Sequence, residues 1–211
     1  MNARRTIAAV ATSTGRGGIG IVRVSGPQAT DVLQALVPDW PTDHPSHTLR
    51  LSSIYVDGHR TDEGLVVLMR APRSYTAEDV VEFQCHGGPI VLRKVLDACV
   101  AAGASVAEPG EFTQRAYLNG RLDLTHAEAV ADLINATSES AHRLALEHLD
   151  GALGEAIRGH LEDVTVAMVL LEAALDFSHE EHVYQIERDE ILARVDRTLD
   201  GLGELRDKFD R

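Results

Sequence analysis

The sequence DVVEFQCHGGP, residues 79–89, decides the first part of the fold because it contains a strand, a turn and a helix start in direct succession. Alternation places every second residue from Val80 on one face of the strand and the residues between them on the other. Two glycines then break the strand, and Pro89 suits the first turn of a helix over residues 90–102. Gly103 is expected to end that helix.

Cys85 and His86, neighbours within this strand, raise the question of a reactive or metal-binding pair. Adjacent strand residues point to opposite faces, so the histidine is not placed to act as a base for the cysteine. Metal ligation needs further Cys or His residues at suitable spacing. We therefore expect Cys85 to pack and His86 to fix the turn or cap backbone groups.

The rest of the first half also alternates between strand and helix patterns, which predicts a mixed α/β domain. Strands are expected over residues 6–12 and 19–26, and Pro27 starts a helix. A hairpin with its turn at Asp57-Gly58 follows. The expected apolar face of the helix is formed by Leu33, Leu36 and Val37.

The second half predicts helices. Thr125 and Glu128 fit a capping box, with the threonine at the N-cap position. Two long amphipathic helices follow, and two such helices bury only one side of each other. Either the chain self-associates or it stops before its helical bundle is complete. The apolar positions expected in a core are Leu144, Leu153, Ile157, Leu161, Val164, Met168, Leu171, Leu175, Ile191, Val195, Leu199, Leu202, Leu205 and Phe209.

An acidic linker is expected over residues 176–185, between the two long helices. His179, Glu180 and His182 within it match no defined zinc spacing, so we predict an irregular loop and no metal site.

Charge is distributed unevenly along the chain, whose net charge is −13. Residues 1–122 hold 12 basic and 12 acidic side chains, whereas residues 123–211 hold 8 and 21. An acidic surface repels phosphate backbones, so this chain alone is not expected to supply a nucleic-acid-binding face. No apolar run reaches membrane-spanning length, and the two cysteines form no disulfide framework. A cytoplasmic protein without a membrane segment is expected.

The glycine-rich loop STGRGGIGIVRVSG, residues 13–26, invites a phosphate-binding interpretation but fits neither strong template. The chain contains no Gly-x4-Gly-Lys-Ser/Thr motif, and these glycines lead into a strand instead of a helix. A tight turn with close backbone packing is the favoured interpretation.

Three charged residues stand out as site candidates. Arg23 lies inside an apolar strand and needs a partner or an anionic ligand. Glu82 lies in the middle of another strand, where it can pair with an arginine or accept hydrogen bonds from a polar ligand. Arg121 follows a turn on the loop that leads into the helices, a common place for ligand sites. The structural alternative for Glu82 is a salt bridge on the strand face, and for Arg121 it is a solvated surface arginine.

Three segments together resemble a known family: TIAAVATSTGRGGIGIVRVSG, RSYTAEDVVEFQCHGGPIVL and EPGEFTQRAYLNGRLDLTHAEAVADLINATSESA. They are similar to the N-terminal domain and first helical segment of the tRNA modification GTPase MnmE, also called TrmE. The resemblance implies an α+β architecture. Residues 1–121 form an aminomethyltransferase-like, folate-binding and dimerisation domain, and residues 122–211 form the first part of an acidic helical domain.

The resemblance also implies a function. The family binds 5-formyltetrahydrofolate or 5,10-methylenetetrahydrofolate as a one-carbon donor, and it forms a homodimer. With the FAD-dependent partner MnmG, it modifies C5 of the wobble uridine of tRNA. GTP, Mg²⁺ and K⁺ belong to a Ras-like domain, and the chain stops about where that domain should begin. No GTP hydrolysis is therefore expected from these residues alone.

The folate-contacting residues of the family fall on Arg23, Glu82 and Arg121. A pterin ring presents an N–H and NH2 edge that a carboxylate can accept, and arginines suit oxygen atoms of the ligand. No residue is assigned to catalysis. A stand-alone folate-dependent aminomethyl- or methyltransferase is the alternative function, although no clear acid or base is offered for it. A module that only docks a partner through its helices is the third.

Overall fold

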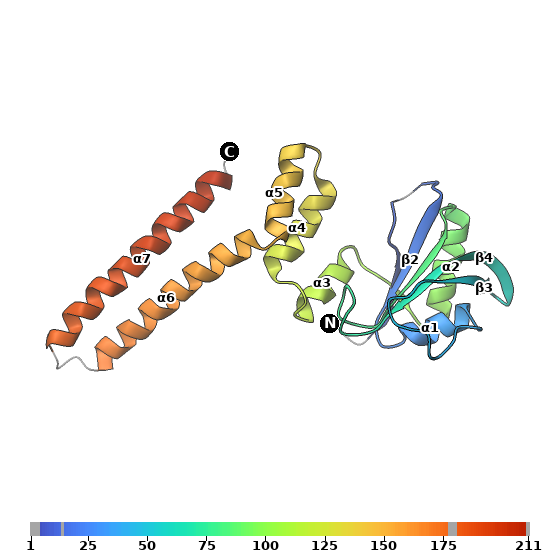
Figure 1. The fold of residues 1–211 in the computed structure, drawn as a ribbon, viewed down its shortest axis with the longest axis horizontal. Coiled ribbons are helices and arrows are strands. Elements are labelled where there is room, and N and C mark those ends of the chain that lie inside the picture. The colour runs from blue at the N-terminus through green and yellow to red at the C-terminus, as the bar shows by residue number, and fades with distance from the viewer. Residues whose placement is uncertain (1–4, 14, 177–180, 210–211) are drawn as a thin grey trace. The chain divides into compact units, whose positions relative to one another are not determined.

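The computed structural model describes residues 5–13, 15–176 and 181–209 of the 211-residue chain. The chain divides into two compact units, Met1–Ala127 and Glu128–Arg211 (Figure 1). The first carries a mixed sheet with helices and the second is helical, so the predicted α+β class is confirmed. Among the described residues, no helix is long and apolar enough to span a membrane.

The described part of the first unit is built on a six-stranded sheet in the order β3-β4-β5-β2-β1-β6. Neighbouring strands pair antiparallel, except β1 and β6, which are parallel. Asp57 and Gly58 join β3 to β4 with φ angles of 51° and 73°, as the predicted hairpin turn requires. The strands are β1 (Ile7–Val10), β2 (Ile19–Ser25), β3 (Arg50–Val56), β4 (His59–Met69), β5 (Val80–His86) and β6 (Ser105–Val106).

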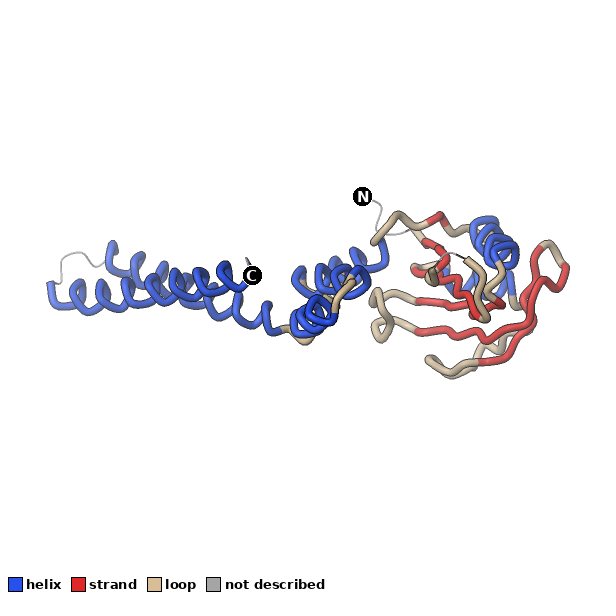
Figure 2. The backbone as a smooth tube through the Cα atoms, turned by 90° about the horizontal axis from the view of Figure 1, so that it is seen from above, coloured by secondary structure: helices blue, strands red, loops and turns tan. Residues whose placement is uncertain are grey.

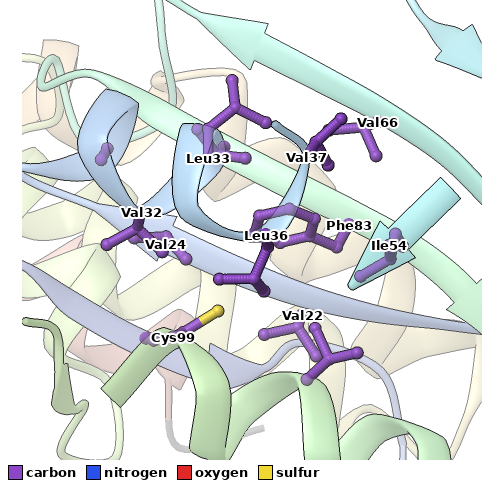
Figure 3. Packing of buried hydrophobic residues seen from close by; sticks show 14 of the residues in the cluster. Val22, Val24, Val32, Leu33, Leu36, Val37, Ile54, Val66, Phe83 and Cys99 are labelled. Carbon is purple, nitrogen blue, oxygen red and sulfur yellow. The ribbon is translucent and has the colours of Figure 1, made fainter. Parts of the chain in front are cut away.

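Two helices, α1 (Ala29–Leu36) and α2 (Pro89–Ala101), supply the apolar side chains that cover one face of this sheet (Figures 2 and 3). Phe83 from β5 and Cys99 from α2 are fully buried in the core between them. The predicted apolar face of α1 is confirmed, because Leu33, Leu36 and Val37 are all buried. The opposite face of the sheet carries both polar and apolar side chains, among them Glu82, Gln84 and Leu65.

The strand, turn and helix predicted around residues 80–103 form as expected. Pro89 occupies the first turn of α2, and Gly103 follows its last turn with a φ of 108°. Gly87 is required by a close approach: a Cβ there would lie 2.6 Å from the carbonyl oxygen of Gly17. The Gly17 amide donates to the Gly87 carbonyl at 3.0 Å. The glycine-rich loop therefore packs backbone against backbone, as expected.

A short helix, α3 (Glu111–Leu118), and a turn at Gly120 precede α4 (Leu124–Asn135). The predicted capping box at Thr125 is wrong. Asp123 caps α4 instead, because its Oδ1 accepts hydrogen bonds from the His126 amide at 2.9 Å and the Thr125 hydroxyl at 2.7 Å. These donors hold the pKa of Asp123 well below its ordinary value. Thr125 is the second residue of the helix, two positions past the cap.

The second unit contains α5 (Glu139–Leu149), α6 (Ala152–Asp176) and α7 (Glu181–Phe209). Helices α6 and α7 lie side by side and antiparallel (Figures 1 and 2), and Asp163 on α6 pairs with both Arg194 and Arg197 on α7. Since α7 begins at Glu181, the predicted linker over residues 176–185 is too long. The side chains of His179, Glu180 and His182 lie outside the described residues.

The predicted apolar stripes of α6 and α7 are only partly covered in the part of the chain that the structure describes, as expected of two helices without further partners. Small side chains, Ala167, Ala174 and Thr198, are buried in this unit, and they allow close approach of helix backbones. Most of the large apolar side chains of α6 and α7 remain exposed; Leu161 and Leu175, for example, are 63% and 69% exposed. Helical spacing identified the apolar positions but not what covers them.

Candidate functional site

Arg23 and Glu82 form an ion pair on the sheet face opposite the helices. They are directly paired positions of the neighbouring strands β2 and β5. The Arg23 Nε donates to Glu82 Oε1 at 2.8 Å, and the two side chains are 27% and 13% exposed. The pairing that the sequence left open is therefore present. It uses one carboxylate oxygen, and no described residue hydrogen-bonds to the other oxygen or to the terminal guanidinium nitrogens.

Aromatic rings surround this ion pair. The Arg23 guanidinium lies 5.5 Å from the centre of the Tyr75 ring and 5.6 Å from that of Phe112. Tyr75 comes from the loop between β4 and β5, and its hydroxyl lies 2.8 Å from the Thr113 hydroxyl on α3. Rings at this distance attract a guanidinium and also provide flat apolar surfaces. The pair therefore lies between polar and aromatic groups that are only partly buried.

Arg121, which follows α3, contacts the same aromatic ring. Its guanidinium lies 5.8 Å from the centre of the Tyr75 ring, and its Nη1 donates to the Tyr75 carbonyl at 3.3 Å. Two of the three sequence-predicted residues, Arg23 and Arg121, thus lie near the Tyr75 ring, and the third, Glu82, is paired with Arg23. Sequence reasoning missed this tyrosine, although an aromatic residue in the polar segment RSYTAED, just before a charged strand, is a recognisable signal.

A buried arginine fixes the loop that carries Tyr75. Arg115 on α3 is 7% exposed and bridges two carboxylates, Glu78 at 3.1 Å and Glu111 at 2.9 Å. Glu78 also accepts from the Ser25 hydroxyl on β2 at 2.6 Å. Burial alone would raise the pKa of Glu111, but the hydrogen bonds it accepts, including that of Arg115, hold it below its ordinary value. The loop is therefore tied to both the sheet and α3.

Cys85 and His86 behave as strand alternation predicts. Cys85 is 2% exposed in the core, and burial, assisted by the charge of Asp62, raises its pKa to about 12. It is a packed thiol and not a nucleophile. His86 is exposed on the other face. It does not cap the turn as expected, because its Nδ1 lies 2.7 Å from Oδ1 of Asp62 on β4.

The small hollow beside the glycine-rich loop has a volume of about 70 Å³. Arg16 and Gly87 are among the residues that line it. A hollow of this size has room for only a few water-sized groups, so it does not serve as a nucleotide pocket. The candidate site is the open face around Arg23, Glu82 and Tyr75.

Comparison with known proteins gives two family matches that together cover most of the chain. The family described as "GTP-binding protein TrmE N-terminus" matches residues 6–121, and the family described as "MnmE helical domain" matches residues 124–211. Similar curated proteins are named tRNA modification GTPase MnmE. That of Heliobacterium modesticaldum is 50% identical over 83% of this chain and 39% of its own length.

Two further relatives of the same name show similar values. The protein of Neisseria meningitidis serogroup B is 48% identical over 83% of this chain and 39% of its own length. That of Alkalilimnicola ehrlichii is 45% identical over 98% of this chain and 46% of its own length. The chain therefore spans less than half the length of these curated relatives.

Proposed function

The chain belongs to the MnmE family of tRNA modification GTPases, and from this membership we propose that its first unit binds a reduced folate. The ligand is 5-formyltetrahydrofolate or 5,10-methylenetetrahydrofolate, which supplies a one-carbon unit when bound. The folate-binding part extends to Arg121, and the acidic helical part begins at Leu122. The ion pair between Arg23 and Glu82 carries the proposal.

The free hydrogen-bonding groups of this pair suit a pterin ring. Glu82 has one carboxylate oxygen that no described residue uses, and a pterin offers N–H and NH2 donors to such an acceptor. The terminal nitrogens of Arg23 suit ring or formyl oxygens. Tyr75 and Phe112 provide aromatic surfaces beside the pair, against which a flat heterocycle packs. Arg121 adds a second cation at the same tyrosine.

Within the whole protein, we propose that this unit also forms the homodimer. The complete enzyme would act with the FAD-dependent protein MnmG on C5 of the wobble uridine of tRNA. GTP, Mg²⁺ and K⁺ would bind at a GTPase domain, for which these 211 residues contain no P-loop motif. The acidic second half, with 21 acidic and 8 basic side chains over residues 123–211, fits a role other than holding the tRNA backbone.

Calorimetric titration of the chain with 5-formyltetrahydrofolate tests the proposal. Glu82→Ala removes the pterin acceptor, and we expect its affinity to fall at least about 10-fold, because charge-assisted hydrogen bonds contribute about 1.5–3 kcal/mol. Asp97→Ala is the matched control, since Asp97 is an exposed carboxylate on α2 that pairs with Arg93. An unchanged affinity in Glu82→Ala would refute the site.

A further inference from the structure

The face of β5 that carries Glu82 continues beyond it with two further polar residues. Glu82, Gln84 and His86 occupy alternate positions and so share one face, whereas Cys85 between them is buried on the other. The β2 partners of Gln84 and His86 are Ile21 and Ile19. At about 3.3 Å per residue, His86 lies about 13 Å along the strand from Glu82.

An apolar strip separates these two ends. Leu51, Leu65, Gln84 and Ile21 stand in register across β3, β4, β5 and β2, next to the row of Arg23 and Glu82. Leu51 is 63% exposed and Leu65 is 40% exposed, because the helices of this unit cover the opposite face. Ile21, Leu65 and Leu51 therefore form an apolar strip, interrupted by the polar Gln84, that adjoins the ion pair.

His86, at the end of the strip, is held in one orientation. Its side chain is 74% exposed, but Asp62, which is only 9% exposed, accepts from both its Nδ1 and its backbone amide at 2.7 Å. Asp62 also accepts from the Glu63 amide at 2.8 Å. Although burial alone would raise the pKa of Asp62, the donors from His86 and Glu63 lower it, so the carboxylate stays ionised.

This anchoring leaves the outer ring nitrogen, Nε2, without a hydrogen-bond partner in the described part of the chain. Since the Nδ1 proton is bound by Asp62, a ligand carboxylate at Nε2 accepts a hydrogen bond from an N–H at that second nitrogen. Other charges stand on the neighbouring elements. Arg60 and Glu63 on β4 pair with each other at 2.6 Å, and Arg16 lies in the loop before β2.

We propose that this face extends the folate site and binds the part of the ligand beyond the pterin. A folate presents, in order, a pterin, an apolar aminobenzoyl ring and a glutamate with free carboxylates. The sheet presents, in the same order, the Arg23–Glu82 pair, the strip around Ile21 and Leu65, and the anchored His86. The glutamate carboxylate is thus paired by His86, and Asp62 is the positioning residue. This inference rests on the proposed folate binding.

Two ligands separate this inference from the folate proposal itself: 5-formyltetrahydrofolate, and 6-methyltetrahydropterin, which lacks the aminobenzoylglutamate tail. We expect His86→Ala to weaken binding of the folate about 10-fold, because one charge-assisted hydrogen bond is lost. The affinity of the same variant for the tailless pterin should change less than about two-fold. Glu82→Ala should weaken both ligands. His59→Ala, an exposed histidine of β4, is the control and should change neither.

The melting temperature of His86→Ala should match that of the unmodified chain, because the ring is exposed. If His86→Ala loses the same affinity for both ligands, or loses no affinity for the folate, the assignment to His86 is overturned. If Glu82→Ala still weakens both ligands, the folate site itself stands.

Discussion

Replacing Arg115 by methionine should destabilise the first unit more than any change at its surface. The side chain of Arg115 is 8% exposed and bridges Glu78 and Glu111. Its Nη1 also donates to the Arg5 carbonyl at 2.9 Å. Its removal leaves the largely buried Glu78 without this cation, and it leaves Glu111 paired with Arg5, whose side chain is 43% exposed. Breaking a buried ion pair from one side costs about 3–5 kcal/mol. For a unit of this size, that loss lowers the melting temperature by roughly 10–20 °C.

The pH dependence identifies the cause. In the native unit the pKa of Glu111 is lowered, so its stabilisation is present at neutral pH and lost on acidification below the ordinary glutamate pKa, about 4.3. In Arg115→Met, Glu111 loses one of the donors that lower its pKa, so less stability remains to be lost on acidification. The difference in unfolding free energy between the two proteins should therefore shrink on acidification.

The single tryptophan makes the measurement specific. Trp40 is 6% exposed in the core of the first unit, so its fluorescence in urea reports the unfolding of that unit. Arg93→Met is the control: Arg93 pairs with Asp97 on the exposed face of α2, and such pairs contribute about 0–1 kcal/mol. A loss below about 1 kcal/mol in Arg115→Met, within the range of surface pairs, or a loss that grows on acidification, would refute the reasoning.

Two further predictions concern the sheet. Replacing both Arg23 and Glu82 by leucine should leave the unfolding free energy within about 1 kcal/mol of the original or raise it, because replacing an ion pair by apolar side chains is often neutral or stabilising. Titration of this double variant with folate should show no binding. A large loss of stability would instead show that the ion pair has a structural role. Cys85 and Cys99, both with a pKa raised to about 12 by burial, should resist a thiol reagent at pH 8 in the native protein and react in urea; rapid native labelling would contradict their burial.

Local chemistry explains which parts of the fold were predictable. The β5–turn–α2 segment follows from strand alternation, two glycines and Pro89, all within a few residues of one another. The cap of α4 was misplaced because Asp123 and Thr125 are both suitable caps, and the choice depends on where the helix begins. The contact surface of α6 and α7 was also not predictable, since periodicity gives a helical face but not its neighbour.

The candidate site shows the same division between local and long-range information. Arg23 and Glu82 could be singled out because a charge inside an apolar strand is costly and needs a partner. Arg23 and Glu82 are 59 residues apart in sequence, and their direct pairing depends on the register of β2 and β5. The aromatic ring of Tyr75 in a polar segment was a signal in the sequence, but its contacts with both arginines could not be predicted, because they join residues far apart in the chain.

The energetics of the Arg23–Glu82 pair favour a ligand over a structural role. A partly exposed pair contributes about 0–1 kcal/mol to folding, and the sheet face beside it is already apolar. Arg115, by contrast, has the features of a structural arginine, because it is almost wholly buried and bridges two carboxylates. Arg23 instead keeps unused donors, and Glu82 keeps an unused oxygen, between the rings of Tyr75 and Phe112. Hydrogen-bonding capacity that folding does not use, at the edge of an open apolar strip, is what binding a flat polar heterocycle requires.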